Sequence, residues 1–410
     1  MAERKKILFV INTLSRAGAE NALMALLRKL LREHGDEYEL SLFVITGQGE
    51  MADEIPEGVK LLNGEYHDES VLSTAGRKLL RRSCLRALFK DGNVFRLFPY
   101  LVSNLAGMIA AKDFRADKLM WRVLSDGAEK TGDHYDLAVA FIEGGSTYYV
   151  ADHVNADKKV AFVHIDLELA GYTRKLDGYC YRQFDRIFAI SKEVKNTFSG
   201  VYPEYAEKAD VFHNIIDPVR ILEMSASGEG FDDGFTGLRI VTLCRLAKQK
   251  AIEVSAVAMH MMKPFLEEKG IEVRWYVFGE GDQRPLIEEY IKRYGLEESF
   301  VLCGTVRNPY PYIAEADLYV HATRYEGKSI AVQEAQVLGK PIIASDCSDN
   351  SNQITDGVDG ILCEFNPKAV AEAVCRLISD KDLMERLGKA ASEKQKKIED
   401  DTDKLTGLIR

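Results

Sequence analysis

The sequence lacks several features that would assign it to a membrane, redox or nucleic-acid-binding class. No apolar run in its 410 residues reaches the roughly 18 needed to span a bilayer. The opening MAERKKILFVINTL passes directly from a basic tip into a predicted strand. The seven cysteines are odd in number and form no C-x-x-C pair, and a net charge of −10 disfavours nucleic acid as a partner. We therefore expect a soluble, cytoplasmic protein without a signal peptide, whose cysteines are reduced core residues.

Two catalytic signatures are also missing. No G-x-G-x-x-G follows the first predicted strand, which argues against a nicotinamide-dependent oxidoreductase. No D-x-D stands at the end of a predicted strand, where it could bridge a metal ion to a diphosphate. We expect neither a metal nor a cofactor.

Short β-branched runs alternate with helical segments, a pattern that is typical of parallel sheets built from βαβ units. In the first half the predicted strands are 5–11, 39–46, 135–142, 158–164, 186–191 and 209–214. In the second half they are 238–244, 273–279, 300–304, 317–322, 340–345 and 360–364. Between the two sets lies SASGEGFDDGFTG (225–237), whose Gly, Ser and Asp residues are typical of a linker. The expected fold is α/β, with two Rossmann-like, doubly wound domains.

The stretch HATRYEGKSIAVQEAQVLGKPIIAS (321–345) places two carboxylates beside a predicted helix N-terminus. Glu326 lies in the loop after a strand, and Glu334 lies in a helix that ends near Leu338. Ligands bind outside the carboxyl ends of such strands, and free amides at a helix start bind anions. The amides in question are those of Lys328, Ser329 and Ile330. A ligand with phosphates and sugar hydroxyls would suit this site, although Glu326 could simply favour the helix dipole while Glu334 is solvated.

Three further loops follow predicted strands. Arg245 and Lys250 lie just past the first strand of the second half, where both could reach a diphosphate, although a solvated basic turn has the same composition. Gly279 and Gly281 would let a backbone approach a ligand. A small-residue turn stands at Thr305.

Taken in order, these loops resemble the nucleotide-sugar domain of retaining GT-B glycosyltransferases of family four. The R-L-x-x-x-K motif of that family appears at 245–250, and its E-x7-E motif appears at 326–334. The resemblance covers nearly the whole chain and is more specific in the second half. It implies two Rossmann-like domains facing a cleft.

The resemblance also implies a role for each motif residue. Arg245 and Lys250 would hold the diphosphate, Glu334 would bind the ribose hydroxyls, and Glu326 would contact the transferred sugar. The turn at Thr305 and Val306 would meet the base. The donor-binding set is then Gly18, Arg245, Lys250, Gly279, Thr305, Val306, Lys328, Ser329, Ile330 and Glu334. The catalytic set is Glu326, His164, Arg245 and Lys250.

In the first half, Gly18 resembles the end of the glycine-rich loop of the family. Ala17 and Ala251 both stand where relatives usually have glycine. His164, at the end of a predicted strand, would face the transferred sugar by resemblance, although a lone histidine there is more often structural.

A narrower resemblance concerns the acceptor side. Glu143, Gly144 and Gly145 follow another strand and resemble enzymes that build capsular and exopolysaccharide repeats. The segment SDCSDNSNQITDG (345–357) lacks the glycines and the acid that many relatives carry, so the donor sugar is not indicated.

These features predict a retaining, metal-independent glycosyltransferase that moves a sugar, by default from a UDP-sugar, to a glycan or lipid-linked acceptor in polysaccharide biosynthesis. The alternatives are a nucleotide-sugar hydrolase or epimerase of GT-B fold, and a non-catalytic sugar-nucleotide-binding subunit. The expected domains are 1–215, with a helical basic insertion at about 70–130, and 216–390. A C-terminal helix at 391–410 is expected to cross back to the first domain.

The segment GRKLLRRSCLRALFK (76–90) combines six basic residues with several large apolar ones and has no acid. A basic amphipathic helix can dock on anionic lipid, which would place the protein at the inner face of the cell membrane. A solvated helix that covers the core of the first domain is the alternative.

Overall fold

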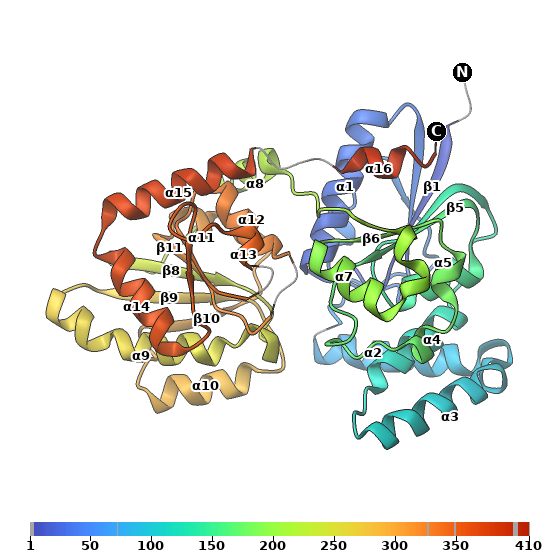
Figure 1. Cartoon of the computed structure of the whole chain (residues 1–410), viewed down its shortest axis with the longest axis horizontal. Helices are drawn as coiled ribbons and strands as arrows, with labels where there is room; N and C mark the ends of the chain where they lie inside the picture. The colour runs from blue at the N-terminus through green and yellow to red at the C-terminus, as the bar shows by residue number, and fades with distance from the viewer. Residues whose placement is uncertain (1–3, 72, 326–327, 348–349, 397–400, 410) are drawn as a thin grey trace. The chain divides into compact units, whose positions relative to one another are not determined.

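Two separate parallel sheets organise the chain in this computed structural model, which describes residues 4–71, 73–325, 328–347, 350–396 and 401–409. One unit comprises Met1–Ile215 together with Asp400–Arg410, and the other comprises Ile216–Glu399 (Figure 1). Each unit has its own sheet and its own buried core. The predicted α/β class with two Rossmann-like domains is confirmed.

The first sheet has seven strands in the order β3-β2-β1-β4-β5-β6-β7. The strands are β1 (Lys5–Ile11), β2 (Tyr38–Val44), β3 (Val59–Leu61), β4 (His134–Ala140), β5 (Asn155–Val163), β6 (Arg186–Ala189) and β7 (Ala209–Val211). All pairings are parallel, and the central strands are buried on both faces, which explains their almost continuous apolar runs. The edge strand β3 was not predicted, because three residues are too few to show a periodicity.

Helices cover this sheet and form the segment between β3 and β4. They are α1 (Gly18–His34), α2 (Thr74–Phe89), α3 (Asn93–Ala111), α4 (Ala116–Gly127), α5 (Gly145–His153), α6 (Arg174–Asp177), α7 (Lys192–Val201) and α16 (Thr402–Thr406). Short 3-10 turns lie at Ala52–Glu54, Lys90–Gly92, Cys180–Gln183 and Pro203–Lys208. The C-terminal segment is not one helix, since α16 is separate and packs on this unit: His213 Nδ1 lies 2.7 Å from Asp401 Oδ2, and Lys404 Nζ donates to the Val211 carbonyl.

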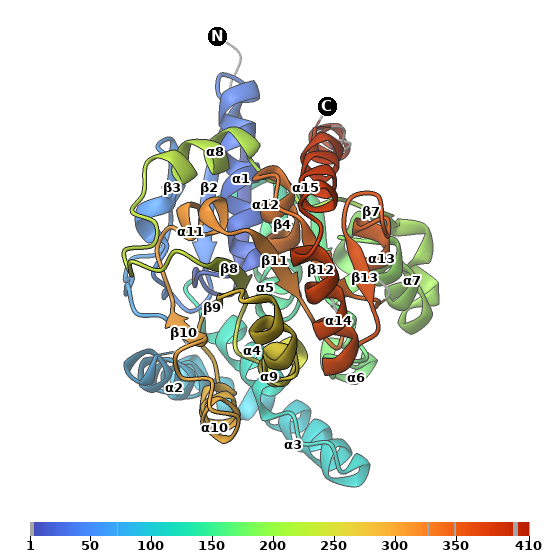
Figure 2. The same ribbon diagram turned by 90° about the vertical axis from the view of Figure 1, so that its left-hand side faces the viewer.

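The second sheet has six strands in the order β10-β9-β8-β11-β12-β13. The strands are β8 (Leu238–Leu243), β9 (Val273–Phe278), β10 (Phe300–Gly304), β11 (Leu318–His321), β12 (Ile342–Ser345) and β13 (Ile361–Cys363). The helices are α8 (Pro218–Ala226), α9 (Ile252–Lys269), α10 (Arg284–Arg293), α11 (Tyr310–Glu315), α12 (Ile330–Val337), α13 (Asn350–Gln353), α14 (Pro367–Ile378) and α15 (Lys381–Gln395), with a 3-10 turn at Lys248–Lys250. One face of the sheet packs against α9, α10 and α14 and the other against α11 and α12, so the sheet is doubly wound (Figure 2).

The expected linker at 225–237 is wrong, because most of this segment packs within the second unit. Asp233 pairs with Arg239 at 2.9 Å and with Arg274 at 3.3 Å. The ring of Phe231 lies 4.4 Å from that of Tyr276. Gly, Ser and Asp correctly indicated irregular backbone, but composition says nothing of the partners that such a segment meets.

Two expectations from composition also need correction. All seven cysteines lie within the described residues and form no disulfide, but only Cys180 among them is buried. The helical stretch Thr74–Ala111 is long and apolar enough to cross a membrane by length and composition. Its two helices are separated by Asp91 and Gly92, both with positive φ (51° and 75°), so the stretch is not one continuous rod.

Candidate active site

At the carboxyl edge of the second sheet, the loops after β8, β9 and β11 are held together by backbone hydrogen bonds. Leu246 N donates to the Glu280 carbonyl at 2.9 Å, and Gln283 N donates to the Leu246 carbonyl at 2.9 Å. On the other side, Arg324 N donates to the Gln249 carbonyl at 2.9 Å. The loop at 244–251 is therefore fixed by both neighbours before any ligand binds.

This fixed loop carries the predicted phosphate contacts. Arg245 is exposed, and its guanidinium makes no hydrogen bond or ion pair with any residue in the described part of the chain. Lys250 ends the 3-10 turn and is half-buried. Because the backbone between them is immobilised, the two cations are presented from one rigid element.

The two alanines that stand where the resembled family usually has glycine differ in backbone conformation. Ala17 has φ −148° and ψ 173°, an extended conformation open to any residue. Ala251 has φ 47° and ψ 43°, the left-handed region that favours glycine. The departure at Ala17 is therefore without conformational cost, whereas Ala251 carries about 1–2 kcal/mol of backbone strain where Lys250 meets α9.

The glycines after β9 make room for the neighbouring Arg245 loop. A Cβ at Gly279 would lie 1.8 Å from the Cys244 carbonyl oxygen, and one at Gly281 would lie 2.2 Å from that of Leu246. Both glycines thus admit the backbone of the Arg245 loop, and the predicted approach of their own backbone to a ligand stays a prediction. Their effect on the site is to set the position of Arg245.

Glu334 is a buried carboxylate on α12. Its side chain is 4% exposed, and Oε1 accepts a hydrogen bond from the Tyr310 hydroxyl at 2.8 Å. Burial raises the pKa of Glu334 to about 7, and the bond from Tyr310 only partly opposes this. The predicted solvated alternative for Glu334 is therefore wrong. Tyr310 is the first residue of α11. Tyr310 and Val306, from the loop between β10 and α11, both pack against the apolar core on the α11 and α12 face of the sheet, whereas Thr305 is exposed.

The start of α12 agrees with the predicted cap, but its anion site is partly occupied. Ser329 is the N-cap, and its hydroxyl accepts from Val332 N. Gln353, from α13, clamps the same residue: its Oε1 accepts from Ser329 N at 2.8 Å, and its Nε2 donates to the Ser329 carbonyl at 2.9 Å. The predicted free amide of Ser329 is thus satisfied. Sequence reasoning missed Gln353, since nothing local links residues 24 positions apart.

Two other predicted positions lie beside this cap. Lys328 is half-buried and Ile330 is the first residue of α12. Glu326 lies outside the described residues, so its predicted role remains a prediction.

In the first unit, His164 and Glu143 meet at the carboxyl ends of β5 and β4. His164 N donates to Glu143 Oε2 at 3.0 Å, and the imidazole lies against the rings of Phe141 and Phe162. Burial lowers the pKa of His164 to about 4, so the ring is neutral at neutral pH. Its Nε2 is buried and has no hydrogen-bond partner among the residues that the structure describes. Such an orphaned nitrogen is suited to a ligand hydroxyl.

Asn12, directly after β1, ties this region together and was also missed. Its Nδ2 donates to the Glu143 carbonyl at 3.0 Å, and its Oδ1 accepts from Ser146 N at 2.7 Å. A Cβ at Gly145 would lie 2.7 Å from Asn12 Oδ1, and Gly144 has φ 84°, so both positions suit glycine. The sequence feature that could have identified Asn12 is its position directly after the first predicted strand. Burial also raises the pKa of Glu143, whose carboxylate is used to hold the backbone of His164.

Gly18 is the exposed first residue of α1. It lies after β1, on the same edge of the first sheet as His164. Apart from Glu326, which lies outside the described residues, the structure therefore brings the predicted residues of each half to the carboxyl edge of their own sheet.

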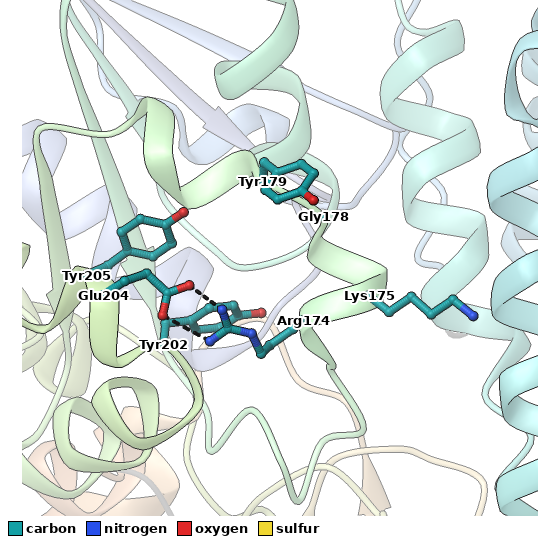
Figure 3. Close-up of a pocket in the computed structure, with 7 residues that line it drawn as sticks. All are labelled: Arg174, Lys175, Gly178, Tyr179, Tyr202, Glu204 and Tyr205. Carbon is teal, nitrogen blue, oxygen red and sulfur yellow. Dashed lines mark hydrogen bonds and ion pairs between the residues drawn. The ribbon is translucent and has the colours of Figure 1, made fainter.

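Two cavities in the first unit lie away from these residues. The cavity in Figure 3, of about 440 Å³, is lined by Arg174, Lys175, Gly178, Tyr179, Tyr202, Glu204 and Tyr205. Arg174 and Glu204 form a two-pronged ion pair across it. A second cavity, of about 680 Å³, adjoins Arg82 and Arg86 of α2. Neither cavity contains a predicted site residue. Within the described ranges, no cluster of three or more His, Cys, Asp or Glu side chains could hold a metal ion.

Comparison with known proteins relates this geometry to sugar transfer. Residues 237–380 match the family model "Glycosyl transferases group 1". The alpha-D-kanosaminyltransferase of Streptomyces kanamyceticus is 29% identical over 153 residues, which are 36% of this chain and 38% of that protein. The amylovoran biosynthesis glycosyltransferase of Erwinia amylovora is 23% identical over 232 residues, or 56% of this chain and 62% of that protein. The chain thus spans less than two thirds of either relative.

Among solved structures, Anabaena HepE in complex with UDP and glucose is similar over 98% of both chains, with a TM-score of 0.66 and 15% identity. At this identity the similarity shows the fold alone. It confirms the predicted GT-B class of two Rossmann-like domains.

Proposed function

We propose that the protein is a retaining, metal-independent glycosyltransferase that transfers a sugar from a nucleotide diphosphate sugar, by default a UDP-sugar, to a glycan or lipid-linked acceptor in polysaccharide biosynthesis. The observation that carries this proposal is the rigid Arg245–Lys250 loop on the same sheet edge as the buried carboxylate of Glu334. The match of residues 237–380 to glycosyltransferases supports it, because those residues contain this edge. Capsule synthesis at the inner face of the cell membrane, from the cytoplasm, is the setting we propose.

The chemistry follows from where charge develops. Cleavage of the sugar–phosphate bond leaves positive charge on the sugar and additional negative charge on the diphosphate. Arg245 and Lys250, held in place in advance, would stabilise the leaving group, and removal of one such contact typically costs about 3 kcal/mol. The loop needs no rearrangement to do this, since its backbone is already bonded on both sides.

The other site residues would position the donor and the sugar. In our proposal Glu334 accepts hydrogen bonds from the ribose hydroxyls, and Glu326 orients the transferred sugar. In the first domain, His164 Nε2 would accept or donate one hydrogen bond to that sugar, because it is neutral and otherwise unpartnered. The acceptor hydroxyl would attack from the face that the diphosphate leaves, which retains the anomeric configuration.

A thermal-shift screen with nucleotides and nucleotide sugars tests donor binding first. A ligand at 100 times its dissociation constant adds about 2.7 kcal/mol of apparent stability. We expect a shift with UDP that Arg245→Ala abolishes and Lys248→Ala, on the same loop but outside the motif, leaves intact. No shift with any nucleotide diphosphate would refute the proposal.

Product analysis then distinguishes the proposed reaction from its alternatives. Incubation of the best donor with membrane lipid extract should yield a glycosylated product of unchanged anomeric configuration by NMR, with or without EDTA. Free sugar formed without an acceptor would favour a hydrolase. Donor binding without turnover on any acceptor would favour a binding subunit.

A further inference from the structure

Helix α3 carries an apolar stripe on its exposed side that the first unit leaves uncovered. Every member of the stripe is large and exposed: Phe95 (83%), Phe98 (61%), Val102 (48%), Leu105 (38%) and Ile109 (65%). Their spacing of three and four residues places them along one face of the helix. From 97 to 111 the sequence contains no charged residue. Contiguous apolar surface of this kind marks an interaction site.

The opposite side of α3 is anchored to the unit. Leu97, Asn104 and Met108 are buried. The Tyr100 hydroxyl donates to the Leu176 carbonyl at 2.8 Å, and Lys175 Nζ donates to the Ser103 carbonyl at 2.5 Å. A helix fixed along its length in this way lies against its unit, at the outer edge seen in Figures 1 and 2, and does not leave it to span a bilayer.

The outward face of the preceding helix, α2, is basic and carries two large exposed apolar residues toward its C-terminal end. Its exposed residues at helical spacing are Lys78, Arg81, Arg82, Leu85, Arg86 and Phe89. The inner face carries Gly76 and Ala87, which are buried, and Leu80, Cys84 and Leu88, which pack on the core. The helix thus covers the core with one face, as the second expectation for 76–90 has it, and presents cations and two large apolar residues with the other, while docking on lipid stays a prediction.

We infer that the exposed faces of α2 and α3 dock the protein on an anionic phospholipid bilayer, with the α3 stripe in the interfacial layer and the α2 cations over the headgroups. The charge of the α2 face indicates which kind of partner binds this surface. The protein as a whole has a net charge of −10, yet α2 itself has no acidic residue. Arg86 lies 4.0 Å from Glu65 of the same unit, and the exposed cations Lys78, Arg81 and Arg82 make the outward face of α2 complementary to anionic lipid.

A second copy of the chain fits this surface less well. In a two-fold dimer, the same patch meets itself, which would bring the arginines of the two α2 helices together. This inference extends the proposed function. It rests on that function only to explain why docking is useful, namely that docking gives access to a lipid-linked acceptor.

Flotation of the full chain with vesicles, in the absence of nucleotide sugar, tests the inference. We expect binding to vesicles of phosphatidylcholine with about 30% phosphatidylglycerol, and at least about 100-fold weaker binding to pure phosphatidylcholine. Phe95→Ser with Phe98→Ser and Val102→Ser should weaken binding at least about 10-fold. The matched control, Val219→Ser with Leu222→Ser, removes equally exposed apolar residues from α8 and should bind as wild type.

The basic face is tested by charge reversal. Each cation near an anionic surface contributes about fivefold to binding, so Arg81→Glu with Arg82→Glu and Arg86→Glu should weaken it at least about 100-fold. The control reverses three exposed lysines elsewhere: Lys269, Lys381 and Lys389.

Three results would overturn the inference: no vesicle binding by the wild type, undiminished binding by either set of α2 or α3 variants, or a concentration-dependent dimer that the α3 variant abolishes. The UDP thermal shift, measured on the same proteins, reports on the proposed function separately. Loss of docking with an intact UDP shift would leave that function standing.

Discussion

Replacing Glu334 with glutamine should make the second domain more stable and a poorer nucleotide binder. The carboxylate is buried, and its pKa is raised from 4.5 to about 7 by that burial. Because the folded state holds the proton more tightly than the unfolded state, the stability from this group is full below pH 4.5 and is lost as pH rises through 7. Glutamine has the same shape and does not titrate.

The magnitude follows from the two pKa values. A difference of about 2.5 units corresponds to about 3 kcal/mol over the whole window. Between pH 5 and pH 8, the advantage of Glu334→Gln over wild type should therefore grow by about 2–3 kcal/mol. The amide oxygen of glutamine can still accept the hydrogen bond from Tyr310.

The assay can isolate the second domain because each unit holds one of the two tryptophans. Trp275 is fully buried in β9, and Trp121 lies in α4 of the other unit. In a Trp121→Phe background, urea unfolding followed by fluorescence at pH 5, 6, 7 and 8 reports on the second domain alone. Glu289→Gln, an exposed carboxylate on α10, is the control and should show no such trend.

Calorimetry with UDP supplies the functional half of the prediction. Wild-type affinity should rise as pH increases through 7, because the ionised carboxylate is the better acceptor for ribose hydroxyls. Glu334→Gln should lose about 1–3 kcal/mol of that affinity. Glu326→Gln should keep UDP affinity nearly unchanged and reduce transfer instead. A stability difference that is flat with pH, together with unchanged UDP affinity, would refute both the pKa argument and the assigned role.

Three further outcomes are expected. Arg245→Ala or Lys250→Ala should each cut transfer by about 100-fold or more in a donor-turnover assay without loss of fold by circular dichroism, and wild-type turnover would contradict the phosphate role. Ala251→Val should lower the free energy of unfolding by at least about 2 kcal/mol, because its φ is 47°, whereas Ala17→Val should change it by less than about 1 kcal/mol. His164→Asn should make the first domain less sensitive to acid. Because the pKa of His164 is near 4, the stability that this group contributes above pH 6.5 is lost as pH falls through 4, by about 3 kcal/mol. Equal acid unfolding of the wild type and the variant would count against this prediction.

The strands of both sheets were predictable because buried parallel strands consist of short runs of β-branched residues. All twelve predicted strands are present, each within a few residues of its expected ends, and β3 was missed because it has only three residues. The cap at Ser329 and the helix that it begins were also predictable, since capping is a local interaction. Local sequence patterns therefore predicted the helices and strands and located the loops that follow the strands.

What the sequence could not supply were partners distant along the chain. The segment around Asp233 has the composition of a linker but is held by Arg239 and Arg274. The sequence predicts a free amide at Ser329, but in the structure this amide donates to Gln353 Oε1. In both cases composition described the backbone correctly, while the tertiary contact decided its role.

The Arg245 loop shows how a motif depends on residues outside it. The R-L-x-x-x-K spacing fixes which residues are cationic but not where their backbone lies. That position is set by Gly279 and Gly281, where any side chain would collide with the loop, and by Arg324, whose amide holds it from the other side. The strained conformation of Ala251 is tolerated because these contacts over-determine the loop. A glycine after β9 thus determines where Arg245 lies, so the proposed phosphate contact depends on that glycine as well as on the arginine.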